Sequence, residues 1–137
     1  MNVGTPQVLD ASTLLAYLRN ETGAQLVEQS LVRGAVMSTT NWSEVLSKLV
    51  DVTGTEGDTI LRTLRERGLL GGLLTIHPLT EEDAVAIARL HPLTRQFGLS
   101  LADRAALALA VRLGAPILTA DRAWQHLSLS VPILLIR

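Results

Sequence analysis

The sequence predicts an α/β fold, a three-layer sandwich with a mostly parallel central sheet. The candidate strands are short and apolar on both faces, which is typical of parallel strands that are covered on both sides. Helical segments separate these strands, as connections between parallel strands require. The chain has 137 residues, 47% of them hydrophobic and 3% aromatic, so we expect one domain over residues 1–137 with an aliphatic core.

Apolar runs mark the expected strands, and apolar residues at helical spacing mark the helices between them. The expected strands cover residues 6–9, 35–38, 73–77, 116–120 and 132–136. The expected helices cover residues 12–19, 24–31, 41–53 and 58–67. A fifth helix is expected to begin at Thr80, with acids in its first turn that favour the positive end of the helix dipole, and to end near His91 and Pro92.

The most apolar stretch runs from Leu99 to Trp124. Ser100 is suited to cap a helix, and every residue from 105 to 111 is apolar, so this helix is expected to be buried all round. Gly114 ends the helix, a buried strand follows, and Asp121 stands at the exit of that strand. A short helical turn is expected around Trp124.

Composition excludes several classes of protein. The net charge is −1 and there is no cysteine, which excludes a polybasic tail, disulfides and thiolate metal sites. The start of the chain lacks a signal-peptide pattern, and no apolar run approaches the roughly 18 residues that a membrane span needs. We therefore expect a cytoplasmic protein with no membrane association.

Four acids are predicted at or near one edge of the sheet: Asp10, Glu44, Asp103 and Asp121. Ligands of open parallel sheets bind beyond the carboxyl ends of the strands. Carboxylates gathered in one pocket repel one another, which raises their pKa values or requires cations. Oxygen ligands without nearby His or Cys favour Mg²⁺ or Mn²⁺, so the sequence predicts a metal site.

Each of these acids also suits a helix N-terminus. Asp10 and Asp121 fit simple N-caps, while Ser100-x-x-Asp103 and Asn41-x-x-Glu44 fit capping boxes. Asp103 favours the site interpretation, because its helical neighbours, among them Ala106 and Leu107, form a small apolar face rather than a solvated one.

Four segments resemble the acidic motifs of PIN domains, in order and over essentially the whole chain. They are Val8-Leu9-Asp10-Ala11-Ser12, Asn41-Trp42-Ser43-Glu44-Val45, Leu99-Ser100-Leu101-Ala102-Asp103 and Thr119-Ala120-Asp121. The order and length are similar to those of VapC-type toxins. The resemblance implies a Mg²⁺- or Mn²⁺-dependent endoribonuclease, usually dimeric, that hydrolyses RNA with metal-activated water and is silenced by a small antitoxin.

The resemblance also assigns roles to residues. Asp10, Glu44, Asp103 and Asp121 would be metal ligands or would hold metal-bound water, and Ser12 and Thr119 would support the site by hydrogen bonds. Asn41 stands where many family members have Ser or Thr, which leaves the polar support at this position open.

Other candidates are weaker. Five arginines are candidate contacts to RNA or to a partner protein: Arg19, Arg62, Arg65, Arg104 and Arg122. A solvated helix face is the ordinary alternative for such residues. Trp124 could stack on a base, but packing against the sheet is favoured, and the three histidines are too scattered for a metal site.

Three alternatives to a toxin remain. One is a PIN nuclease of RNA processing or decay, and another is a non-catalytic binding domain with the same fold. The third is a phospho-receiver domain, which would need an acid after the third strand and a late lysine. Here His77 and Pro78 end that strand, and Lys48 is the only lysine.

Overall fold

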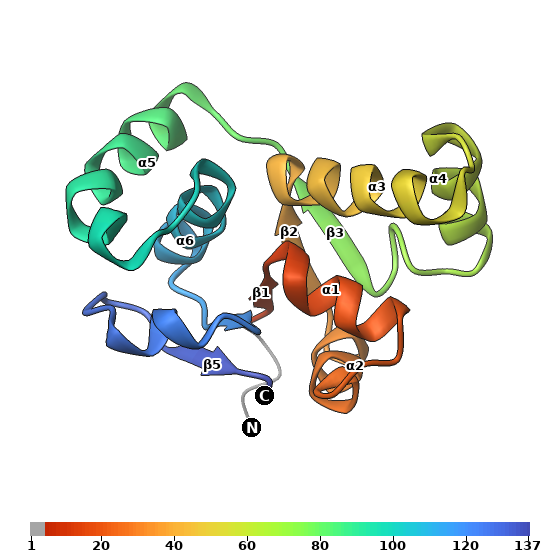
Figure 1. Cartoon of the computed structure of the whole chain (residues 1–137), viewed down its shortest axis with the longest axis horizontal. Helices are drawn as coiled ribbons and strands as arrows, with labels where there is room; N and C mark the ends of the chain where they lie inside the picture. Colours follow the sequence, from red (N-terminus) through yellow and green to blue (C-terminus); the bar gives the residue numbers. More distant parts are fainter. Residues whose placement is uncertain (1–4) are drawn as a thin grey trace.

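The computed structural model describes residues 5–137, which form one parallel sheet in the order β3-β2-β1-β4-β5 (Figure 1). The strands are β1 (Gln7–Leu9), β2 (Ala35–Ser38), β3 (Leu74–His77), β4 (Ile117–Thr119) and β5 (Ile133–Leu135). Side chains alternate across the sheet. Val8 and Ile117 enter one core cluster, whereas the next residues, Leu9 and Leu118, enter the other.

Helices cover both faces of the sheet. One layer contains α1 (Ala11–Leu18), α2 (Ala24–Val32), α3 (Thr39–Thr53) and α4 (Gly57–Glu66). The other contains α5 (Glu81–Thr94) and α6 (Leu101–Leu113), with the 3₁₀ turns η1 (Arg95–Phe97) and η2 (Arg122–His126). In Figure 1, α5 and α6 lie at the left and α1 to α4 at the right. This arrangement confirms the predicted three-layer α/β sandwich.

Helix α6 matches its predicted limits. Ser100 Oγ accepts a hydrogen bond from the Asp103 backbone N–H at 3.1 Å, and Gly114 closes the helix in the left-handed conformation at φ 62°. The six residues from Ala105 to Ala110 are buried, as their uniform apolarity predicts. Val111 is partly exposed, so the buried face ends one residue earlier than expected.

Two helix limits differ from the prediction by about two residues, whereas the others agree to within one residue. Helix α3 begins at Thr39 rather than Asn41, because Ser38 is its N-cap, so Glu44 lies in the second turn and the predicted Asn41-x-x-Glu44 box is wrong. Helix α5 continues through Pro92 to Thr94. Proline removes only one backbone donor in this last turn, and the Arg95 backbone N–H that follows still donates to His91 O. The buried Thr94 hydroxyl donates to Leu90 O at 2.8 Å.

The strand order places the candidate acids. β1 is central, β2 and β3 extend to one side, and β4 and β5 extend to the other. The order therefore reverses between β1 and β4, the point where open parallel sheets bind ligands. Asp10 follows β1 and Asp121 follows β4, so both lie at this switch point. Among the described helices, none is long and apolar enough to span a bilayer.

Candidate active site

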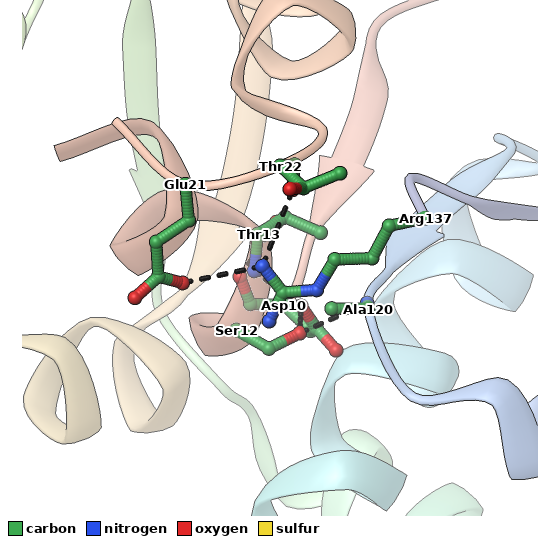
Figure 2. A network of polar contacts seen from close by, with 7 residues as sticks. All are labelled: Asp10, Ser12, Thr13, Glu21, Thr22, Ala120 and Arg137. Carbon is green, nitrogen blue, oxygen red and sulfur yellow. Dashed lines mark hydrogen bonds and ion pairs between the residues drawn. The ribbon is translucent and has the colours of Figure 1, made fainter. Parts of the chain in front are cut away.

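Asp10 is the most enclosed of the four candidate acids, with 3% of its surface exposed. It caps α1, and its Oδ1 accepts hydrogen bonds from Ser12 Oγ at 2.7 Å and from the Thr13 backbone N–H at 3.0 Å. Its Oδ2 accepts from Thr119 Oγ1 at 2.6 Å. Figure 2 shows Asp10, Ser12, Thr13 and Ala120 together at the start of α1. Asp10 is therefore both a helix cap and a buried, oriented carboxylate.

Burial raises the pKa of Asp10 from 3.8 to about 6, because the charged form is poorly solvated. The hydrogen bonds from Thr119, Ser12 and Thr13 act in the opposite direction and lower this pKa. Repulsion from the Asp103 carboxylate raises it further, which shows that these two acids are electrostatic neighbours. A cation close to both acids would reverse the repulsion and favour the ionised form of Asp10.

The end of β4 is bound to the start of α1 by side chains. Ser12 Oγ accepts from the Ala120 backbone N–H at 3.1 Å, and Thr119 Oγ1 accepts from the Asp121 backbone N–H at 3.1 Å. Asp121 is exposed, and its Oδ1 caps η2 by accepting from the Ala123 N–H at 3.0 Å. The supporting positions predicted for Ser12 and Thr119 thus lie directly against Asp10.

Asp103 takes part in the capping box of α6. Its Oδ2 accepts from the Ser100 backbone N–H at 2.9 Å, and its side chain is half-buried. The capping interpretation of Asp103 is therefore confirmed, but it involves only one carboxylate oxygen. Glu44 lies on α3 and is also half-buried.

The four acids do not form a ready-made coordination site. Within residues 5–137, no group of three or more His, Cys, Asp or Glu side chains is placed to hold a metal ion. The charge of Asp103 raises the pKa of Asp10, so these two carboxylates lie close enough to interact. The all-oxygen donor set suits a hard divalent cation, but binding by more than two of these acids requires side-chain movement.

The candidate arginines separate into two groups. Arg19, Arg62, Arg65 and Arg122 are exposed, but Arg104 is half-buried and its Nη1 donates to Ile87 O of α5 at 3.0 Å. Arg104 is thus engaged in helix packing, which argues against the RNA contact predicted for it. Within the described residues the ion pairs are Arg112–Asp83 and Arg137–Glu21, so none of the five arginines pairs with an acid. Figure 2 shows Arg137 reaching Glu21 and Thr22.

Two polar residues near the site make contacts that the sequence did not predict. Ser38 and Asn41 are both buried and hydrogen-bond to each other, and Asn41 reaches α6. The capping-box pattern and the resemblance had pointed to Asn41, but no local pattern indicated its contact with α6 or its hydrogen bonds with Ser38. Trp124 is fully buried, which confirms its predicted packing against the sheet. Trp42 is also nearly buried, so neither ring is free to stack on a base.

The chain is similar to known proteins in both family and fold. The family model for the PIN domain matches residues 8–128. Among curated proteins, no sequence matches the chain. PIN domains are generally nucleases that use divalent metal ions.

Three solved structures share the fold. FitAcB from Neisseria gonorrhoeae is 17% identical with a TM-score of 0.69, covering 94% of this chain and 96% of that chain. A toxin–antitoxin complex from Klebsiella pneumoniae is 15% identical with a TM-score of 0.68, covering 96% and 98%. FitAB bound to a DNA fragment is 18% identical with a TM-score of 0.67, covering 94% of each chain. With the family match over most of its length, the chain belongs to the PIN domain family.

Proposed function

We propose that this chain is a divalent-metal-dependent endoribonuclease and the toxin of a toxin–antitoxin pair. The observation that carries the proposal is the buried Asp10 carboxylate, held by three donors at the switch point of the sheet. Burying a carboxylate is costly, and groups with strongly perturbed pKa values concentrate at functional sites. Membership in a family of nucleases supports a hydrolytic role for this carboxylate.

The chain's residues would act as follows. Asp10, Asp103, Glu44 and Asp121 would hold Mg²⁺ or Mn²⁺, and the bound cation would supply an activated water and neutralise charge on the phosphoryl oxygens. Ser12 and Thr119 fix both oxygens of Asp10, so this carboxylate needs little reorientation. The exposed arginines Arg19, Arg62, Arg65 and Arg122 are candidate contacts to the RNA backbone or to a partner.

A nuclease assay on purified protein tests this proposal. The wild type should cleave total RNA with Mg²⁺ or Mn²⁺ and should not cleave it in EDTA. Asp10→Asn should lower the rate by about 100-fold or more, because replacing even a group that only supports a metal ligand typically costs about 10- to 100-fold. Asp51→Asn is the matched control, because Asp51 is an exposed acid on α3. Cleavage that persists in EDTA, or equal cleavage by Asp10→Asn, would contradict the mechanism, and preferential cleavage of single-stranded DNA would contradict the substrate class.

The toxin role is supported by the toxin–antitoxin complex among the similar folds. Expression of the chain without a partner should arrest bacterial growth, and Asp10→Ala should relieve the arrest at equal protein level. The toxin would act on RNA in the cytoplasm, and a small antitoxin should restore growth. Equal toxicity of Asp10→Ala and the wild type would leave nuclease activity without a role in the arrest.

We also propose a homodimer. Helices α5 and α6 expose large apolar side chains, among them Leu93 at 59% and Leu101 at 61%, and exposed apolar patches often mark interfaces. Light scattering at micromolar concentration should give twice the chain mass of 14.8 kDa. The mass of a single chain under these conditions would contradict the proposal.

A further inference from the structure

The start of α3 is bound to the start of α6 by the side chain of Asn41, which is 1% exposed. Asn41 Nδ2 donates to the backbone oxygen of Ala102 at 3.0 Å, across a separation of 61 residues. Within the described residues, no other side-chain hydrogen bond or ion pair joins these two helices. This bridge is therefore a specific tether between them.

Ser38 determines which way the Asn41 amide points. Ser38 Oγ accepts from the Asn41 backbone N–H at 3.2 Å and donates to Asn41 Oδ1. Because Oδ1 faces this hydroxyl, Nδ2 is directed to the Ala102 carbonyl, which can only accept. Both polar atoms of the amide are thus satisfied, as a buried polar side chain requires.

The tether lies next to two candidate acids. Glu44 follows Asn41 by three residues on α3, so the two share one side of the helix. Asp103 directly follows Ala102 at the start of α6, and its carboxylate is held by Ser100. Any movement of α3 relative to α6 would change the distance between Glu44 and Asp103.

We infer that Asn41 is a positioning residue that holds α3 against α6 and thereby sets the separation of Glu44 from Asp103. This role rests on the proposed function, in which both acids hold the divalent cation. Asparagine suits the position because Nδ2 lies one bond farther from the backbone than the hydroxyl of Ser, and this reach is needed to contact Ala102. Groups that support metal ligands without touching the metal commonly alter metal affinity 10- to 100-fold when they are replaced.

The matched control is Thr94→Val. Thr94 is also fully buried and its hydroxyl donates to a backbone oxygen, that of Leu90, but it lies on α5. Asn41→Ala and Thr94→Val each remove a hydrogen bond from a buried side chain to a backbone oxygen, but the bond of Thr94 lies within α5. Thr94→Val therefore controls for the loss of stability alone, without a change in the contact between α3 and α6. Asn41→Ser is a milder second variant, which retains a polar group beside Ser38 but cannot reach Ala102.

Two measurements separate positioning from stability. The first uses the lack of cysteine in the chain: spin labels at Lys48→Cys on α3 and Val111→Cys on α6 report the distance between the helices. Both positions are exposed. The second is the Mg²⁺ concentration that half-saturates RNA cleavage, measured together with KM for RNA at saturating Mg²⁺.

Both Asn41 variants should broaden or shift the label distance, and Thr94→Val should leave it unchanged. The Asn41 variants should also raise the half-saturating Mg²⁺ by about 10-fold with little change in KM for RNA, whereas Thr94→Val should change neither. A label distance in both Asn41 variants equal to that in Thr94→Val would overturn the inference. If the wild type cleaves no RNA, the proposed function fails, but the label distances still decide the role of Asn41.

Discussion

Replacing Asp10 with asparagine should stabilise the metal-free protein at neutral pH and above. Folding raises the pKa of Asp10 from 3.8 to about 6, mainly by burial. Between these values the folded protein retains a proton that the unfolded chain has lost, so the free energy of unfolding falls as the pH rises. A shift of about two pKa units corresponds to roughly 3 kcal/mol, which is fully present below about pH 4 and lost above about pH 6.

Asparagine has nearly the same shape but does not titrate. Its Oδ1 can accept from Ser12 and Thr13 as Asp10 does. Its Nδ2 would face Thr119 Oγ1, which already accepts from the Asp121 N–H, and this mismatch should cost about 1 kcal/mol. We therefore expect Asp10→Asn to be about 2 kcal/mol more stable than the wild type at about pH 8, and about 1 kcal/mol less stable below about pH 4.

Urea unfolding in EDTA, followed by circular dichroism between about pH 4 and pH 8, measures this difference across the titration window. Asp51→Asn is the control for loss of one negative charge, because Asp51 is exposed, and its stability should follow that of the wild type at every pH. A constant difference between Asp10→Asn and the wild type across the range would refute the reasoning. So would a wild type that gains stability relative to Asp10→Asn as the pH rises.

Three further predictions concern other contacts. Thr119→Val removes a donor that lowers the pKa of Asp10, so the acid limb of the pH–rate profile should move to higher pH. An acid limb that does not move would exclude an effect of Thr119 on the titration of Asp10. Asp103→Asn should reduce the stabilisation by Mg²⁺, which for the wild type is roughly 1.4 kcal/mol at ten times Kd; identical responses in thermal melts would make Asp103 a helix cap only. Asp83→Asn breaks the ion pair with Arg112 Nε at 3.0 Å. It should lower the free energy of unfolding by about 1–3 kcal/mol, between the values for exposed and for buried pairs, because Asp83 is buried and Arg112 is partly exposed. It should leave the Mg²⁺ requirement unchanged, and a changed requirement would link α5 to the site.

Local signals were sufficient for most of the secondary structure and for the fold class. Ser100 and Gly114 delimit α6 because capping depends on backbone groups within one turn of each residue. Apolar runs separated by helices indicated a parallel sheet, because parallel strands need such connections. Two helix limits were wrong by about two residues: Ser38 caps α3 earlier than expected, and α5 continues past Pro92, because a proline in the last turn removes only one backbone donor.

The sequence also identified which acids to examine, but it could not separate caps from site residues, since both uses favour Asp and Glu in the first turns of helices. Asp10 proved to be both, and only the sheet order brought Thr119 to its Oδ2 across 109 residues. The tether from Asn41 to Ala102 likewise depends on how α3 and α6 pack. Sequence pattern assigns a side chain to an edge or a face, whereas a hydrogen bond of about 3 Å is decided by the docking of whole elements against a shared core.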